Sequence, residues 1–498
     1  MSTFSFAIGS LGVVACWQLY GLLQKRRDNP LGLPLPPGPK GYPLIGNLLD
    51  MPTQKPWEVY DKWSEIYGNV IYFEVLGRSF LILGDYESVY DLFEKRSSNY
   101  SDRIRLPMMN EMMGFNWVFG LMRYGTWWRR NRRTFHDHFH PNVVPKYQSI
   151  QVSSARSFLR WLLKTPDDFV NHIRRTFTTS TVKILYGMTL SERDDPYLEN
   201  SETVIRSFSE AGNPGTFLVD LFPAMKYIPA WFPGAQWKRK AISWRQTIRI
   251  FLHEPWDAVK TRMREGTADP CIASTLIEKL TDDNSPENGE EEIGRSICGA
   301  AVIGGADTTV STIHSLFMAM ALYPEVQKRA QDELDMILSG RLPDFQDRPS
   351  LPYIEAMVKE LLRWQLVTPL AMAHSTSEAD EYNGYYIPRG TVVIGNAWRI
   401  LHDPEVYKDP LEFRPERFLK DGKIDPGVRD PMIAFGFGRR ICPAVYDIRP
   451  GLDSNGKEIA IQPEMTSELL SHPKPFTCRI IPRSREAVEL IRDSSLME

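Results

Sequence analysis

A glycine-rich, doubly basic segment near the C-terminal end holds the cysteine with the clearest chemical setting in the chain. In AFGFGRRICPAVYDIRPG, residues 434–451, Cys442 follows Phe435, Gly438 and Arg440. Glycines let a backbone turn tightly and approach a flat ligand closely, and an arginine beside such a loop can pair with a carboxylate. A buried thiolate needs a partner, which iron would supply. The alternative is a core cysteine in a glycine turn, because cysteine is often buried as a small hydrophobe.

A second candidate site is GGADTT, residues 304–309, inside a long apolar segment that runs from about 293 to 322. Each glycine in a helix costs about 1 kcal/mol relative to alanine, and a carboxylate such as Asp307 is costly there unless it is paired. Two interpretations remain open. The segment is a locally bent core helix with a satisfied aspartate, or a groove opened for a small ligand with an acid and an alcohol beside it.

Two further segments carry charges at spacings that favour ion pairs. Glu360 and Arg363 are three residues apart in EAMVKELLR, so they share one helical face. Arg417 lies in the proline-bounded stretch FRPERF, residues 413–418. Taken singly, any such pair is usually a surface ion pair of small value.

Composition limits the class of protein. The chain has 498 residues, 42% of them hydrophobic, and a net charge of −3, so it can bury a large core and has no overall basic field that would point to nucleic acid. Its five cysteines are scattered without a CxxC pair. This argues against a disulfide framework or a zinc site and favours a reducing compartment.

The amino-terminal segment predicts a membrane anchor. Residues 4–24 carry no charge and are followed at once by Lys25, Arg26 and Arg27, an order that places the start in the lumen and the rest in the cytosol. A cleaved signal peptide would carry its charge before the apolar run, and a buried core helix is the other alternative. We therefore predict an anchor over residues 1–24 and a basic, proline-rich hinge over 25–41.

The remaining chain, residues 42–498, reads as one main domain of mostly α class with a smaller β portion (α+β). Residues 70–84 predict a β-hairpin turning near Gly77 and Arg78. Much of 85–335 predicts helix, and the apolar segment ends where Pro324 suits the first turn of a new helix. Beyond residue 366, proline, glycine and β-branched residues predict loops and short strands.

In this order, the segments resemble the cytochrome P450 family of haem-thiolate monooxygenases. The resemblance covers nearly the whole chain and rests on the hinge PLPPGPKGYPLIGN, WWRRNRR at 127–133, GGADTT, ELLR at 360–363, PERF at 415–418 and FGFGRRIC at 435–442. Residues 217–234 and 384–410 look like those of fungal members, and the chain is similar to the fungal O-methylsterigmatocystin oxidoreductase-like group.

The resemblance implies haem b (iron protoporphyrin IX) as cofactor, with Cys442 as the proximal thiolate ligand of its iron. The other cofactor-binding positions that it implies are Arg440, Trp128, Arg132 and His374 at the propionates, with Phe435, Gly438, Gly304 and Gly305. It further implies that the two helical glycines make room for dioxygen, that Thr308 hydrogen-bonds it, and that Asp307 passes protons inward from solvent. Glu360, Arg363 and Arg417 would form a buried structural network behind the haem.

The implied reaction inserts one oxygen atom from O2 into an apolar small molecule, a secondary metabolite or xenobiotic. The chain has no nucleotide-binding glycine motif, so electrons from NADPH would come through a separate reductase, NADPH-cytochrome reductase. The implied location is the endoplasmic reticulum membrane, with a single pass and a cytosolic catalytic domain. Apolar, methionine-containing segments are candidate pocket walls, with plain core packing as the alternative: 105–120, 217–222, 302–306 and 368–373.

The chain departs from the family pattern directly after Cys442. Ala444 stands where the family has glycine, and the long helix that normally starts at the cysteine cannot form, because Arg449, Pro450 and Gly451 follow closely. Family-like sequence resumes at 472–483. Three explanations compete: an error in the gene model, a real variant that holds haem poorly, or a working enzyme with a substitute packing element. A non-catalytic haem-binding relic is the alternative function, and a haem-dependent isomerase has no positive support.

Overall fold

The structure is a computed structural model that describes residues 29–191, 195–213, 215–282, 289–435, 447–450 and 462–494. The predicted anchor, residues 1–24, and the start of the predicted hinge lie outside the described residues, as do Gly438, Arg440 and Cys442. Within the described ranges, no helix combines the length and apolar character needed to cross a membrane.

The described residues divide into two compact units. The first, here called the sheet unit, comprises the described residues of Met1–Pro52, Val59–Ile104 and Ala373–Asn396. The second, the helical unit, comprises those of Thr53–Glu58, Arg105–Met372 and Ala397–Glu498. A segment distant in sequence, 373–396, thus completes a unit that begins near the amino terminus.

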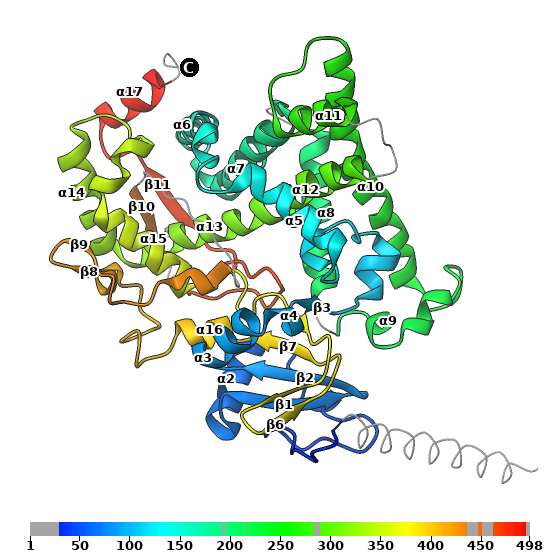
Figure 1. Ribbon diagram of the computed structural model, residues 1–498. Coiled ribbons are helices and arrows are strands. Elements are labelled where there is room, and N and C mark those ends of the chain that lie inside the picture. Colours follow the sequence, from blue (N-terminus) through cyan, green and yellow to red (C-terminus); the bar gives the residue numbers. More distant parts are fainter. Residues whose placement is uncertain are drawn as a thin grey trace, which may run out of the picture. The chain divides into compact units, whose positions relative to one another are not determined.

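The sheet unit is built on a five-stranded sheet in the order β1-β2-β7-β4-β3 (Figure 1). The predicted hairpin is confirmed: β1 (Val70–Val75) pairs antiparallel with β2 (Arg78–Leu83). Its turn is Leu76 and Gly77, both with positive φ (49° and 78°), the backbone that two-residue hairpin turns favour. The turn therefore lies one residue earlier than the sequence predicted.

Later segments extend this sheet. The strand β7 (Val392–Gly395) pairs parallel with β2 and antiparallel with β4 (His374–Ser375), which pairs with β3 (Asp102–Arg103). A separate two-stranded sheet joins β5 (Asp380–Tyr382) to β6 (Tyr385–Ile387). The helices around these strands are α2 (Pro56–Tyr67), α3 (Tyr86–Val89) and α4 (Ser97–Tyr100). The ring of Trp63 on α2 meets Phe73 of β1 edge-on at 5.4 Å.

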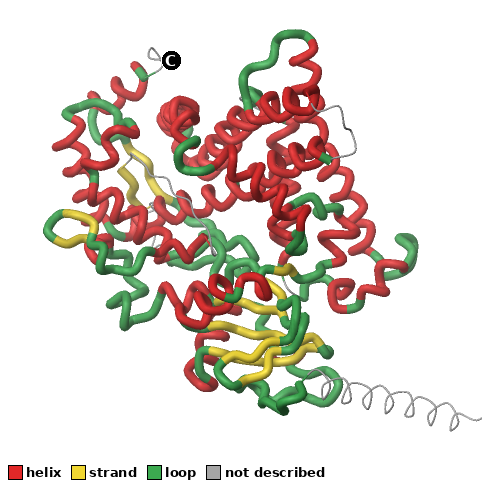
Figure 2. The backbone as a smooth tube through the Cα atoms, viewed as in Figure 1, coloured by secondary structure: helices red, strands yellow, loops and turns green. Residues whose placement is uncertain are grey.

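The helical unit contains most of the helix in the described ranges (Figure 2). Its helices are α5 (Thr126–Phe139), α6 (Gln148–Lys164), α7 (Phe169–Tyr186), α8 (Pro196–Gly212), α9 (Leu218–Leu221), α10 (Gln236–Arg264), α11 (Ile272–Asp282), α12 (Glu290–Gly305), α13 (Asp307–Leu322), α14 (Pro324–Leu338), α15 (Pro352–Trp364), α16 (Ala397–Leu401) and α17 (Arg485–Asp493). Its short strands are β8 (Leu419–Lys420), β9 (Lys423–Ile424), β10 (Asp447–Pro450) and β11 (Cys478–Ile481). The predicted class, mostly α with a smaller β portion, is confirmed.

The long apolar segment forms two consecutive helices, because α12 ends at Gly305, α13 begins at Asp307, and Ala306 between them has ψ −66°. The helix α12 packs closely at two of its glycines, Gly294 and Gly299. A Cβ at Gly294 would lie 2.4 Å from the Trp256 ring, and one at Gly299 would lie 2.7 Å from Trp117. The predicted start of a new helix at Pro324 is confirmed by α14.

The chain after the cysteine loop returns as strand. The strand β10 pairs antiparallel with β11, with Pro450 opposite Cys478, and β10 also contacts α13 and α14. Proline lacks the N–H that a helix interior needs and is tolerated at a strand end. The prediction that residues 447–450 do not continue a helix is therefore confirmed.

Candidate functional site

A short open strip interrupts the otherwise buried surface where α12 meets α13. Gly304 is exposed and Gly305 and Thr308 are half-buried, whereas Ile303 and Ala306 are buried. A Cβ at Gly304 would have no atom within 4 Å, and one at Gly305 would meet only the Thr181 hydroxyl, at 4.0 Å. Here glycine leaves surface open, whereas Gly294 permits close packing.

Two threonine hydroxyls donate to backbone carbonyls across the helix break. Thr308 Oγ1 donates to the carbonyl of Gly304 and Thr309 Oγ1 donates to that of Gly305, both at 2.7 Å. Such bonds from threonine to the residue four positions earlier commonly accompany bent helices. The bond also orients the Thr308 hydroxyl, whose oxygen keeps lone pairs that can accept a hydrogen bond from a ligand.

Asp307 has the partner that its burial requires. Its Oδ2 lies 2.9 Å from Nε2 of His472, and its side chain is 11% exposed against 22% for His472. The sequence predicted that the carboxylate would be costly unless paired, but it did not predict His472. No spacing pattern links the two residues, since they are 165 positions apart.

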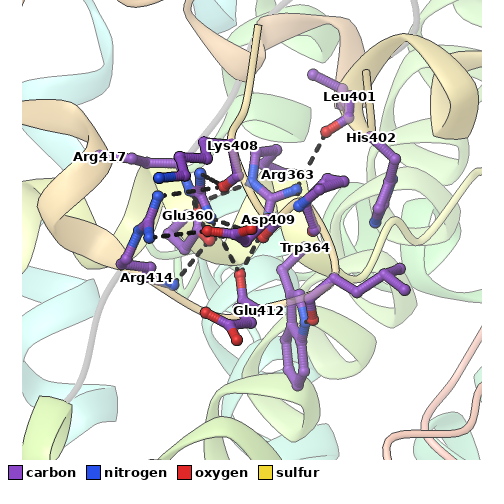
Figure 3. Close-up of polar contacts among 12 residues, drawn as sticks. Glu360, Arg363, Trp364, Leu401, His402, Lys408, Asp409, Glu412, Arg414 and Arg417 are labelled. Atoms are coloured by element: carbon purple, nitrogen blue, oxygen red, sulfur yellow. Dashed lines mark hydrogen bonds and ion pairs between the residues drawn. The ribbon is translucent and has the colours of Figure 1, made fainter. Parts of the chain in front are cut away.

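Glu360, Arg363 and Arg417 form an ion-pair network, to which backbone groups of other segments also contribute (Figure 3). Arg363 donates from Nε to Oε2 and from Nη2 to Oε1 of Glu360, each at 2.8 Å, and both side chains are fully buried. The remaining donors of Arg363 bond to the carbonyl of Leu401, the last residue of α16, and to those of Pro410 and Glu412 in the segment that follows. All five N–H groups of a guanidinium are thereby satisfied.

Arg417 completes this network from η10 (Pro415–Phe418), a short 3-10 helix. Its Nε lies 3.1 Å from the Glu360 carboxylate, and Figure 3 shows its guanidinium beside the carbonyl of Lys408. Burial lowers the pKa of Arg417, and the Glu360 charge opposes that shift. The backbone N–H of Arg414, not predicted, also donates to Glu360 at 2.8 Å. The network ties α15 to the loop 401–417.

The predicted propionate-binding residues lie on separate elements. Trp128 and Arg132 are four residues apart on α5, so they share one helical face. Trp128 is half-buried with its ring 5.1 Å from Tyr124, and Arg132 is exposed. His374 belongs to β4 in the sheet unit, where Nδ1 lies 2.7 Å from the carbonyl of Tyr100. Burial of the imidazole, followed by the nearby Arg103 charge, lowers the pKa of His374 to about 3.

The cysteine loop can be followed only to its start. Phe435 is half-buried at the end of η11 (Pro431–Phe435). The Thr368 hydroxyl donates to the carbonyl of Ala434 at 3.3 Å, which holds the beginning of the loop beside the apolar stretch 368–373. The proposed roles of Cys442, Arg440 and Gly438 stay predictions because these residues lie outside the described ranges.

Comparisons with known proteins agree with these features. The family model "Cytochrome P450" matches residues 36–443. The chain is 45% identical over 484 residues to cytochrome P450 monooxygenase COX2 of Coprinopsis cinerea, covering 93% of this chain and 92% of the relative. It is 39% identical to tryptamine 4-monooxygenase of Psilocybe cyanescens, covering 92% and 94%.

A third relative, cytochrome P450 monooxygenase COX1 of Coprinopsis cinerea, is 39% identical over 515 positions, covering 99% of each chain. The alignment has 515 positions and this chain has 498 residues, so at least 17 aligned positions of the relative have no counterpart in this chain. The family model also stops one residue after Cys442. The chain belongs to the cytochrome P450 family.

Proposed function

We propose that the chain is a haem-dependent monooxygenase that inserts one atom of O2 into an apolar small molecule, with electrons from NADPH delivered by a separate reductase. In the balanced reaction, substrate, O2, two electrons and two protons give a hydroxylated product and water. The observation that carries the proposal is the open strip of Gly304, Gly305 and Thr308 at the break between two buried helices. It occurs in a chain that belongs to the cytochrome P450 family.

The described residues beside Gly304 leave space that fits a flat cofactor. The space over Gly304 has no protein atom within 4 Å of a built Cβ, so a planar group or a small ligand can approach the backbone closely. Cys442 would hold the haem through its iron. When bound, haem supplies the activation of O2 that no side chain provides.

The proposed roles of the protein groups follow from their positions. Thr308 presents a hydroxyl oriented by the Gly304 carbonyl, which would hold a ligand oxygen beside the strip. Asp307, the next residue toward the amino terminus, is buried and paired with His472, so it would hold a proton near that hydroxyl. Gly304 and Gly305 would leave room for the small reactant. Glu360, Arg363 and Arg417 would act by stabilising the fold.

The substrate-binding wall would be adaptable and apolar. Three methionines of η3 (Met108–Met113), namely Met108, Met109 and Met113, are almost fully buried in the larger hydrophobic cluster. Methionine side chains adjust to varied shapes. One relative is named a tryptamine 4-monooxygenase, which supports a small organic substrate. A secondary metabolite or xenobiotic remains the proposed class.

We infer a membrane-bound setting from the sequence alone. The uncharged residues 4–24 followed by Lys25, Arg26 and Arg27 favour an anchor whose following domain is cytosolic. The proposed location is the endoplasmic reticulum membrane, where NADPH-cytochrome reductase would supply electrons.

The proposed gap after Cys442 bears on whether this chain, made as written, holds haem. Three observations support a missing segment: the family match ends at 443, at least 17 aligned positions of one relative have no counterpart, and strand begins at Asp447. A helix of about 20 residues burying ten side chains, at ~1.5–3 kcal/mol each, would exceed a typical domain stability. A haem-deficient relic is therefore the second candidate function.

Isotopic labelling tests the proposed reaction. The haem-loaded chain, the reductase and NADPH are incubated with a terpene hydrocarbon as the probe under labelled dioxygen. The expected product carries one labelled oxygen atom, and formation depends on NADPH. A product whose oxygen comes from water would contradict the monooxygenase assignment, and a haem-loaded chain that forms no product would favour the relic.

A further inference from the structure

The pairing of Asp307 with His472 connects the helix break to the segment that follows the proposed gap. Asp307 is the first residue of α13, and its carboxylate is nearly buried. His472 is about twice as exposed, at 22% against 11% for the two side chains. The imidazole therefore lies between a buried carboxylate and solvent.

Backbone and hydroxyl contacts fix the position of His472. The backbone N–H of His472 donates to Thr466 Oγ1 at 3.0 Å, and the backbone carbonyl of His472 accepts from the backbone N–H of Thr466 at 2.8 Å. The preceding residue, Ser471, is fully buried; its N–H donates to the Val367 carbonyl at 2.7 Å, and its carbonyl accepts from the Ser311 hydroxyl at 2.5 Å. Ser311 lies one helical turn beyond Asp307 on α13. The Ser311–Ser471 and Asp307–His472 contacts therefore both hold the segment 466–472 against α13.

The surroundings place other titratable groups near the pair. His314, on the same helix, stacks on Phe476 with ring centroids 5.0 Å apart. Burial, and then the nearby His472 and Arg174, lower the pKa of His314 to about 4. Lys474, two residues beyond His472, is paired with Glu464 at 2.5 Å. Among these groups, His472 is the one whose described side-chain bond reaches Asp307.

We propose that His472 is a positioning residue for Asp307 and links its carboxylate to the protons of the solvent. The proposal deepens the proposed monooxygenase function and rests on it, because that reaction consumes two protons for each O2. His472 takes up a proton from water, its Nε2–H passes to Oδ2 of Asp307, and the imidazole becomes neutral. The carboxyl group then releases the proton on the side of Thr308 and returns to its ionised form.

A double-mutant cycle tests the pairing without any need for catalysis. Asp307→Asn, His472→Gln and the double variant of the full chain are unfolded in urea, and their unfolding equilibrium constants are compared. We expect the two changes to be non-additive by about five-fold or more, since contacting residues couple and distant ones add. His253→Gln, on α10, replaces His472→Gln in the control cycle and should be additive with Asp307→Asn. Additivity of the Asp307 and His472 changes would overturn the proposal.

A coupling assay tests the proton link in the haem-loaded chain, with an alkoxycoumarin as the probe. Product formed per NADPH oxidised should fall several-fold in His472→Gln and equally in His472→Ala, because glutamine keeps a donor but cannot relay a proton. The His253→Gln control should match the unchanged chain. Full coupling in His472→Gln, with loss in Asp307→Asn, would overturn this inference and leave the proposed function standing. If neither Asp307→Asn nor Thr308→Ala changes coupling, the proposed function fails, and the urea cycle still decides the pairing.

Discussion

Glu360 and Arg363 form a two-point ion pair in which both side chains are fully buried, with N–O distances of 2.8 Å at each point. The two residues lie one turn apart on α15, yet their other hydrogen bonds reach residues between 401 and 417. Because every donor of Arg363 is satisfied, the network avoids the cost of a buried charge without a partner.

Removing the shared carboxylate charge should destabilise the fold strongly. Glu360→Gln leaves Arg363 and Arg417 without their buried counter-charge, so we expect a loss of about 3–5 kcal/mol in the free energy of unfolding. Glu355→Gln is the matched control on the same helix, since it removes the exposed pair with Arg348 and should cost less than about 1 kcal/mol. Urea denaturation measures both. Equal, small losses would contradict a structural role for the network.

The glycines of α12 should separate into two kinds. The Cβ added by Gly304→Ala would meet no atom within 4 Å. The variant should therefore be as stable as the unchanged chain, or more stable by up to about 1 kcal/mol through helix propensity. Its haem affinity should fall, because the methyl group fills the open strip. Gly294→Ala would bring a Cβ to 2.4 Å from Trp256 and should lower stability. Urea denaturation and haem titration are measured on both variants. Destabilisation by Gly304→Ala would contradict the open strip.

Thr308 should matter for coupling more than for folding. In Thr308→Ala, the hydroxyl that donates to Gly304 is lost, and we expect NADPH oxidation to continue while product per NADPH falls several-fold. Thr308→Ser keeps the hydroxyl and should restore most of the coupling. The measurement is product and hydrogen peroxide formed per NADPH. A non-catalytic relic would show no difference between the two variants.

The buried His314 predicts a loss of stability in mild acid. Burial is the main cause that lowers its pKa in the folded chain from 6.5 to about 4, so as pH falls the unfolded chain takes up the proton first. The stability it contributes is complete above about pH 6.5 and is lost toward about pH 4, by about 3 kcal/mol. His314→Phe, between Phe169 and Phe476, removes this group. The wild-type chain should therefore lose more stability than the variant between neutral pH and about pH 5. Parallel pH profiles would contradict the prediction.

Local patterns predicted local structure well. The hairpin at 70–84, the helix start at Pro324 and the pairing of Glu360 with Arg363 depend on neighbours in sequence, and each is present. For the paired glycines the sequence left a bent helix and an open groove as alternatives, and the helix breaks at Ala306.

Contacts across long sequence distances could not be predicted in the same way. Asp307 required a partner, but nothing in the spacing identified His472, because its place is set by the turn at 466–472 and the Ser311 contact. Likewise, the donors of Arg363 are completed by backbone carbonyls of Leu401, Pro410 and Glu412, whose positions depend on tertiary folding. The assignment of 373–396 to the sheet unit follows from pairing with β2, again a non-local event.

The most direct test of the account is the carbon monoxide difference spectrum of the reduced protein. It is recorded for the chain as written and for a restored chain, in which the segment after Cys442 is taken from cytochrome P450 monooxygenase COX1 of Coprinopsis cinerea. The third sample is the restored chain with Cys442→Ser. We expect the long-wavelength Soret band of thiolate-ligated haem in the restored chain, its loss in Cys442→Ser, and a weaker band in the chain as written. A restored chain that binds no haem, or a Cys442→Ser variant that keeps the band, would contradict the central claim that Cys442 holds the cofactor.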